Sequence, residues 1–187
     1  MALPHFTSKI SEHKDLESLV TYGFRGEALA AVCAVGKLTV TTRTDADEVA
    51  SVYTMDNSGE IADIKPSHMS QGTQVTVSQL FYNVPVRKQY FQTPRRKKDE
   101  ILKVEDLLLS FGLIHPELHL SFHNDHRLIW QKSRATDFNK NVLQTLGHSI
   151  SSHMEFIKED TTVKPFLFYV NIQNRFYSWY SFRLNFF

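Results

Sequence analysis

Apolar and polar residues alternate along three stretches in the first half of the chain, as they do in half-buried β-strands. These stretches cover residues 38–42, 50–55 and 74–80, and residues 60–64 form a return strand after the second. The residues between the second stretch and its return, 56–59, read Asp-Asn-Ser-Gly, which is the composition of a tight turn. The pattern therefore predicts an antiparallel meander.

The second half of the chain shows helical periodicity. Between residues 101 and 111 an apolar side chain recurs every three or four positions, which predicts the clearest amphipathic helix of the chain. Thr93 and Pro94 precede it as the expected N-cap and first helical residue, and Gly112 is expected to end it.

Three shorter helices are predicted from capping signals and runs of helix-forming residues. The first covers residues 12–20 behind Ser11, and the second covers residues 28–35 with Gly36 at its C′ position. The third begins after Asp137, a good N-cap residue.

A second hairpin is predicted over residues 118–130, with Leu118, Leu120 and Phe122 facing the core. Its histidines, His119, His123 and His126, have no cysteine or acidic ligand nearby, so no metal site is expected there. Helices beside antiparallel strands predict an α+β fold, a two-layer sandwich of a mostly antiparallel sheet with helices on one face.

Composition narrows the class of protein. The 187 residues are 42% apolar, enough for one sizeable core, and the net charge of +1 gives no global field for nucleic acid. Cys33 is the single cysteine and cannot form an internal disulfide; we expect it to pack in the core. No apolar run reaches membrane-spanning length, so no membrane partner is expected.

Gly23 and Gly26 bracket a short loop directly before the predicted helix 28–35. The first turn of a helix has unpaired N–H groups and the positive end of the helix dipole, which together favour a phosphate. The same spacing also fits an ordinary tight turn, and the spacing alone does not distinguish the two.

The seven residues from Gly23 to Leu29, GFRGEAL, resemble the phosphate-lid motif of the MutL-like DNA mismatch-repair ATPases, which belong to the GHKL superfamily. Two further stretches match in the family's order. Thr7-Ser8-Lys9-Ile10 stands at its T-S-K-I segment, and residues 72–88 look like its G-T-x-V-x-V-x-x-L-F-x-N-x-P-x-R motif. The amino-acid sequence at residues 21–23, 87–89 and 129–134 is most similar to the eukaryotic post-meiotic-segregation branch of the family.

This resemblance covers roughly residues 5 to 157. It implies that residues 1–157 form an incomplete GHKL (Bergerat) ATPase domain and that residues 158–187 are a divergent tail. It also implies ATP as the cofactor, with Mg²⁺ in the intact family. The residues implied to contact the nucleotide are Thr7, Ser8, Lys9, Gly23, Phe24, Arg25, Gly26, Glu27, Ala28, Leu29 and Thr73.

Without the resemblance, residues 7–9 would be interpreted as a frayed polar terminus and Thr73 as a polar residue at a strand edge.

The family's general-base glutamate, magnesium-binding asparagine and adenine-reading aspartate belong to a helix before Thr7, and we expect this chain to lack them. Glu27 is not the base in the family, and we expect it to stabilise the helix start. The chain is therefore expected to bind nucleotide weakly and not to hydrolyse it alone.

A basic cluster follows the third strand. It contains Arg87, Lys88 and residues 95–98, and Tyr90 and Phe91 lie within it. Cations interleaved with aromatics can follow a nucleic-acid backbone, but charge runs also commonly face water. Both interpretations stay open.

Residues 166–187 contain ten aromatic side chains. Such a tail is either a partner surface or a truncated or alternatively spliced end outside the core.

The sequence leaves two candidate functions for the chain. One is an incomplete mismatch-repair ATPase module in the nucleus, with a MutL-type partner subunit and mismatched DNA as partners. The other is a non-catalytic interaction fragment that binds such a subunit or DNA.

Overall fold

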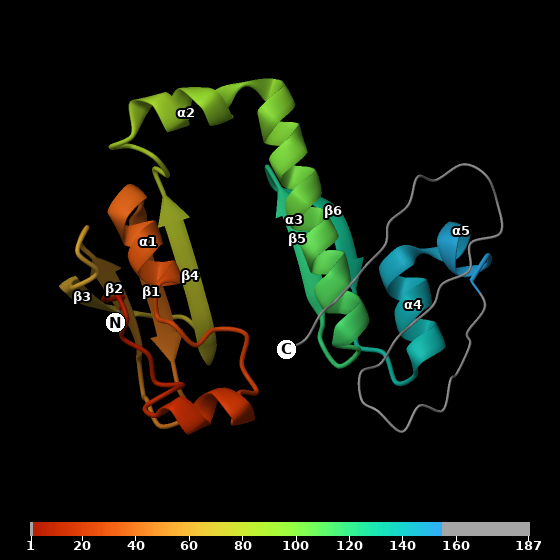
Figure 1. Ribbon diagram of the computed structural model, residues 1–187, viewed down its shortest axis with the longest axis horizontal. Helices are drawn as coiled ribbons and strands as arrows, with labels where there is room; N and C mark the ends of the chain where they lie inside the picture. The colour runs from red at the N-terminus through yellow and green to blue at the C-terminus, as the bar shows by residue number, and fades with distance from the viewer. Residues whose placement is uncertain (1, 155–187) are drawn as a thin grey trace. The chain divides into compact units, whose positions relative to one another are not determined.

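The computed structural model describes residues 2–154, so the aromatic tail lies outside the described residues. The chain divides into two compact units, Met1–Lys97 and Lys98–Phe187. Each unit combines helices with antiparallel strands, in agreement with the predicted α+β class (Figure 1).

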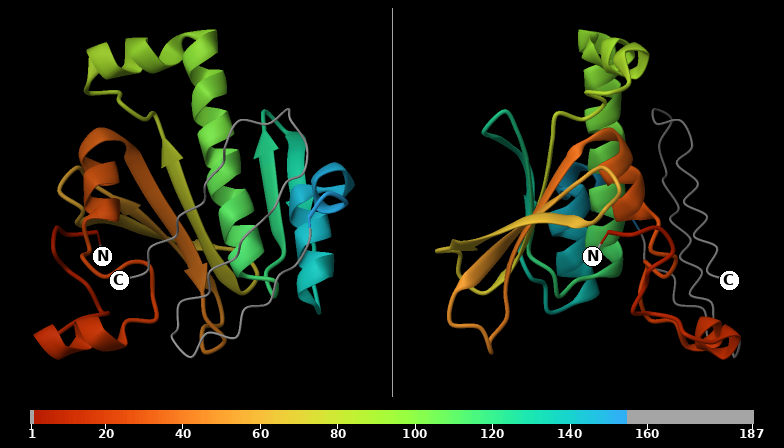
Figure 2. Two further views of the ribbon diagram at one scale, coloured as in Figure 1. Left: turned by 45° about the vertical axis from the view of Figure 1, so that its right-hand side comes forward. Right: turned by 90° about the vertical axis from the view of Figure 1, so that its left-hand side faces the viewer.

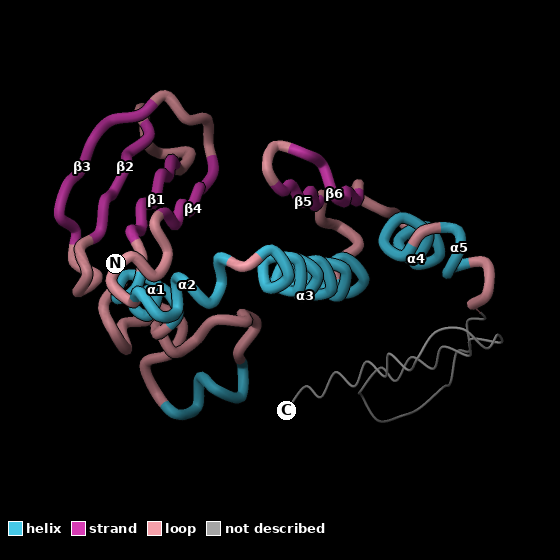
Figure 3. Tube along the Cα trace, turned by 90° about the horizontal axis from the view of Figure 1, so that it is seen from above, coloured by secondary structure: helices cyan, strands magenta, loops and turns pink. Residues whose placement is uncertain are grey.

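The first unit contains a four-stranded sheet. Its strands are β1 (Lys37–Arg43), β2 (Ala50–Met55), β3 (Ile61–Ser67) and β4 (Gly72–Ser78), in the order β3-β2-β1-β4 (Figure 3). The predicted meander is confirmed for the first three strands. The fourth strand returns to pair with β1, so β3 and β4 form the two edges.

Helix α1 (Ala28–Val35) lies along one face of this sheet, as the right-hand view of Figure 2 shows. The core beneath it is built from Ala2, Cys33, Leu38, Val40 and Met55. Burial raises the pKa of the Cys33 thiol, which therefore packs as an apolar residue, as predicted.

Helix α1 ends at Val35 as predicted, and Gly36 is its C-cap residue rather than the predicted C′ residue. Its φ of −148° is extended backbone that any residue can adopt. The N–H of Gly36 donates to the carbonyl oxygen of Val32 at 2.8 Å, and β1 begins at the next residue. Gly36 therefore acts as a one-residue connection that reverses the chain.

The helix predicted over residues 12–20 is a short 3₁₀ helix, η1 (His13–Ser18), and its N-cap is Glu12 rather than Ser11. The Asp15 carboxylate accepts hydrogen bonds from the N–H groups of Ser11 and Glu12, and these bonds lower its pKa. Val20 is exposed, so the predicted apolar side of this helix does not pack as one face.

Helix α2 (Pro85–Gln92) was not predicted. Pro85 occupies the first turn of this helix, where its missing N–H costs nothing. The preceding loop reverses direction through Gln79 and Phe81, whose φ angles of 51° and 61° lie in the left-handed region.

Helix α3 (Pro94–Ile114) starts at Pro94 as predicted and leads into the second unit. That unit also contains the hairpin β5 (Leu120–Asn124) and β6 (Arg127–Lys132), followed by α4 (Phe138–Leu146) and α5 (His148–Ser151). Asp137 caps α4 as predicted, because its carboxylate accepts from the N–H of Lys140 at 2.8 Å.

The prediction that Gly112 ends α3 is wrong. The helix continues to Ile114, and Gly112 is buried inside it. A Cβ atom at this position would lie 3.2 Å from Thr145 Cγ2, 3.2 Å from the Trp130 ring and 3.3 Å from Lys132 Cδ. Gly112 is thus a packing residue that lets α4 and β6 approach α3 closely.

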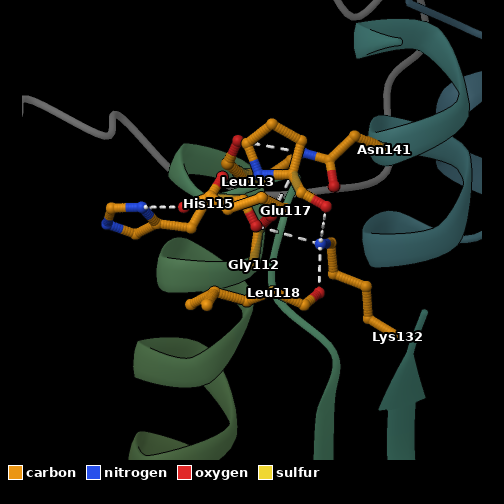
Figure 4. Close-up of polar contacts among 8 residues, drawn as sticks. Gly112, Leu113, His115, Glu117, Leu118, Lys132 and Asn141 are labelled. Atoms are coloured by element: carbon orange, nitrogen blue, oxygen red, sulfur yellow. Dashed lines mark hydrogen bonds and ion pairs between the residues drawn. The ribbon is translucent and has the colours of Figure 1, made fainter. Parts of the chain in front are cut away.

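The lysine at the end of β6 joins the elements of the second unit (Figure 4). Lys132 is 1% exposed, and its ammonium donates to the carbonyl oxygens of His115, Pro116 and Leu118 at 2.9 to 3.0 Å. Asn141 of α4 donates to the carbonyls of Gly112 and Leu113 at the end of α3. Side chains from β6 and α4 therefore satisfy the last carbonyls of α3 and the turn after it.

Candidate functional site

The loop from Gly23 to Glu27 delivers the chain onto the first turn of α1. Glu27 is the N-cap, and no side chain caps the turn. The N–H groups of a first turn have no partner within the helix, so this loop presents main-chain donors and the positive end of the helix dipole. Arg25 at its tip has a side chain that is 69% exposed.

Gly26 brings the two implied nucleotide-binding segments together. Its φ is +66°, and a Cβ atom there would lie 2.1 Å from the carbonyl oxygen of Phe6. Only glycine fits, because both the left-handed backbone and the approach of another main chain exclude a side chain. The main chain directly before Thr7 therefore packs against the loop.

Glu27, the residue after Gly26, also contacts the amino-terminal segment. One carboxylate oxygen lies 3.5 Å from His5 Nδ1 and 3.9 Å from Arg25 Nε. These are exposed pairs and contribute little stability. They do show that the Glu27 carboxylate faces the Arg25 guanidinium of the loop and the His5 ring of the amino-terminal segment.

Residues 7–9 form a local turn in which the Lys9 N–H donates to Thr7 Oγ1 at 3.1 Å. Ser8 and Lys9 then line an open hollow of about 280 Å³ together with Thr21 and residues of η1. Thr21 in turn donates its hydroxyl to the carbonyl of Gly23. The hollow therefore adjoins the start of the lid motif.

Thr73 lies at the beginning of β4 and pairs with Thr42 near the end of β1. The two hydroxyl oxygens are 2.8 Å apart, and Thr42 also lies 3.3 Å from the carbonyl of Gly72. Thr42 shares the buried face of β1 with Leu38 and Val40, because residues two apart in a strand face the same way. Thr73 therefore faces the side of the sheet that α1 covers.

In Figure 1, α1 and β1 run in opposite directions. The first turn of α1 consequently lies toward the end of the sheet where β1 finishes and β4 begins. All of the implied nucleotide-binding residues belong to the first unit: Thr7, Ser8, Lys9, Gly23, Phe24, Arg25, Gly26, Glu27, Ala28, Leu29 and Thr73. Phe24 and Gly26 are half-buried, whereas Ala28 and Leu29 form the first exposed turn of α1.

Sequence reasoning missed Phe6 and Thr21 as parts of this arrangement. The Phe6 contribution comes from its main chain, for which the residue type gives no signal. Residues of the motif Leu80-Phe81-x-Asn83 contact the C-terminal end of α1. The Phe81 N–H donates to the carbonyl of Val35 at 2.6 Å. Among residues 2–154, no three His, Cys, Asp or Glu side chains are grouped as a metal site would require.

Comparison with known proteins identifies this arrangement. The human protein PMS1 protein homolog 1 is 48% identical over 155 residues, which cover 83% of this chain and 17% of that protein. The Arabidopsis thaliana DNA mismatch repair protein PMS1 is 36% identical over 176 residues, which cover 89% of this chain and 19% of that protein. The chain belongs to the MutL-like DNA mismatch-repair family.

Solved structures agree. The crystal structure of the N-terminal domain of a DNA repair protein has a TM-score of 0.66 and 31% identity, covering 84% of this chain and 46% of that one. The Aquifex aeolicus MutL ATPase domain complexed with ADP has a TM-score of 0.58 and 23% identity, over 73% of this chain and 52% of that one, and shares the fold. No family model matches the chain.

This MutL-like chain spans about a fifth of the length of the curated relatives it matches. Its α+β fold is the ATPase-domain fold of those structures, as the motif resemblance implied. Within the part of the chain that the structure describes, no helix is both long and apolar enough to cross a membrane.

Proposed function

We propose that the loop from Gly23 to Leu29 binds the triphosphate of ATP, with Thr7, Ser8, Lys9 and Thr73 beside it. Three features of the first unit support this: the uncapped first turn of α1, the exposed guanidinium of Arg25 and the hydroxyls at the start of β4. Main-chain donors at a helix start and an exposed guanidinium are groups that bind phosphate oxygens.

The observation that carries the proposal is the contact of Gly26 with Phe6. It brings the main chain directly before the T-S-K-I segment against the lid loop, which supports a ligand shared by the two segments. Mg²⁺ belongs to the same proposal and would be held through the phosphates.

We infer that this chain alone does not hydrolyse ATP. A general base must reach its water, and Glu27, the acidic residue of the loop, faces His5 and Arg25 instead. We further propose that residues 1–157 act as the ATPase-type module of a nuclear mismatch-repair protein. In that role, ATP binding would control dimerisation with a MutL-type subunit and engagement of mismatched DNA.

A non-catalytic interaction fragment is the second candidate function. It is favoured by the edge strand β4, where Val75 is 52% and Val77 43% exposed. Apolar side chains on an open sheet edge are typical of a surface that pairs with another segment. Such a fragment would bind a MutL-type subunit or DNA without needing nucleotide.

Isothermal titration of the whole chain with a non-hydrolysable ATP analogue and Mg²⁺ distinguishes the two functions. We expect weak binding that Arg25→Ala reduces and that the exposed-surface control Lys65→Ala leaves unchanged. Absence of binding, or equal binding by both variants, would reject the lid proposal in favour of the interaction fragment. Phosphate release that Arg25→Ala abolishes would contradict the inferred lack of hydrolysis.

A further inference from the structure

The two edges of the sheet in the first unit differ in how they are protected. Natural edge strands carry charges, proline or a bulge, which keep them from pairing with another chain. Strand β3 contains Pro66, which has no N–H group, and the ion pair of Asp63 with Lys65 at 2.7 Å. Its register with β2 also shifts after Thr54. The β3 edge is therefore protected against further pairing.

The opposite edge, β4, has none of these features (Figure 3). Its sequence, GTQVTVS, contains neither a charge nor a proline, and all of its residues are exposed. It pairs with β1 from Lys37 to Arg43 without a register shift. The β-branched threonines and valines favour a strand that is paired on both sides. Strand β4 thus has the composition of a central strand, although β1 is the one neighbour that the described strands give it.

Two apolar side chains of β4 are left uncovered beside the core. Val75 and Val77 lie opposite Val40 and Leu38 in the ladder, so they share the face on which α1 packs. Helix α1 contacts β1, and both valines of β4 stay about half exposed. Covering them would remove apolar surface from water, which favours association.

From this contrast we infer that β4 pairs antiparallel with β4 of a second copy of this chain, about a two-fold axis at Thr76. Residues equally far from the axis then lie opposite each other, so Val75 lies opposite Val77 of the second copy. Opposing residues of an antiparallel pair share a face, and the four valines form one apolar cluster beside the two α1 helices. A register shifted by one residue would separate them onto opposite faces.

The charges favour a second copy as the occupant of this edge. In a two-fold pair each strand meets itself, so a charge at the axis would face a like charge. Strand β4 contains no charge, and the proposed register places Gln74 opposite Ser78 of the second copy and Thr76 opposite its own equivalent. One strand pair is smaller than the roughly 1,200 Å² of stable interfaces, so we expect a weak dimer.

This inference rests on the interaction-fragment function proposed above and names its partner. The test is sedimentation equilibrium of the whole chain over a range of concentrations, without nucleotide, so that failure of the lid proposal does not affect the outcome. We expect a monomer–dimer equilibrium that Thr76→Lys and Thr76→Glu each weaken about tenfold or more, because like charges then meet at the axis. An equimolar mixture of the two variants should dimerise again, because opposite charges then meet there.

Ala62→Lys is the matched control, since it places the same charge on the exposed β3 edge and should leave dimerisation unchanged. Circular dichroism establishes that each variant is folded. A chain that stays monomeric, an unchanged dimer in Thr76→Lys, an equal loss in Ala62→Lys, or a mixture that does not associate would each overturn the inference. Binding of another MutL-type subunit by a monomeric chain would keep the interaction-fragment function and reject the second copy as its partner.

Discussion

The side-chain amide of Asn83 donates a hydrogen bond of 2.8 Å to the main-chain carbonyl of Ala34. Ala34 belongs to the last turn of α1, the helix that begins at the lid loop, while Asn83 lies 49 residues later in the loop before α2. The carbonyls of a last helical turn have no partner within the helix. The motif asparagine therefore holds the far end of the lid helix.

We predict that Asn83→Ala lowers the free energy of unfolding by about 1 kcal/mol, since it removes one net hydrogen bond. Urea denaturation followed by circular dichroism measures the change. The control is Asn139→Ala on the exposed side of α4. If both variants lose the same stability, the bond to Ala34 does not hold α1.

Gly26→Ala should be destabilising, because alanine is strained at a φ of +66° and its Cβ would collide with the Phe6 carbonyl. The left-handed backbone alone costs about 1–2 kcal/mol. Gly23→Ala is the matched control in the same loop, since nothing lies within 4 Å of the added Cβ. Thermal unfolding and limited proteolysis near Phe6 report the effect, and equal behaviour of the two variants would disprove the close approach.

Lys132→Met should cost about 2–3 kcal/mol, because it removes a buried ammonium that donates to main-chain carbonyl oxygens. The ammonium serves three of them, those of His115, Pro116 and Leu118. Lys103→Met on α3 is the control, since it removes a lysine whose ion pair with Glu100 is exposed. Chemical denaturation of the two variants gives the difference, and a loss for Lys132→Met no larger than for Lys103→Met would show that the buried lysine is dispensable.

Stability should fall in acid partly through Asp56. Its carboxylate accepts from the Ser58 hydroxyl and from the N–H groups of Ser58 and Glu60, and these bonds lower its pKa. A pKa lowered by folding adds stability above the unfolded value, and this stability disappears as the pH falls through the folded value.

The difference in melting temperature between the unmodified chain and Asp56→Asn should therefore shrink below about pH 4. Asp45→Asn, in the exposed connection between β1 and β2, is the control. A pH-independent difference would mean that the carboxylate charge does not stabilise this turn.

The sequence by itself determined the local features of both units. Alternation along residues 38–42 and 50–55 predicted β1 and β2, because a strand with one buried face needs that period. Asp137 predicted the start of α4, since a cap is a local hydrogen bond. The motif from Gly23 to Leu29 identified the family because its seven residues are consecutive in the sequence.

Only the tertiary structure decided the contacts between distant residues. Gly112 was predicted to end a helix and instead packs inside it, because its neighbours Trp130 and Thr145 come from later elements. The sequence gives no sign that Lys132 is buried. Its ammonium can be buried because main-chain carbonyls of the turn after α3 accept its hydrogen bonds. The approach of Phe6 to Gly26 has no sequence signal, because a main-chain atom contributes the contact.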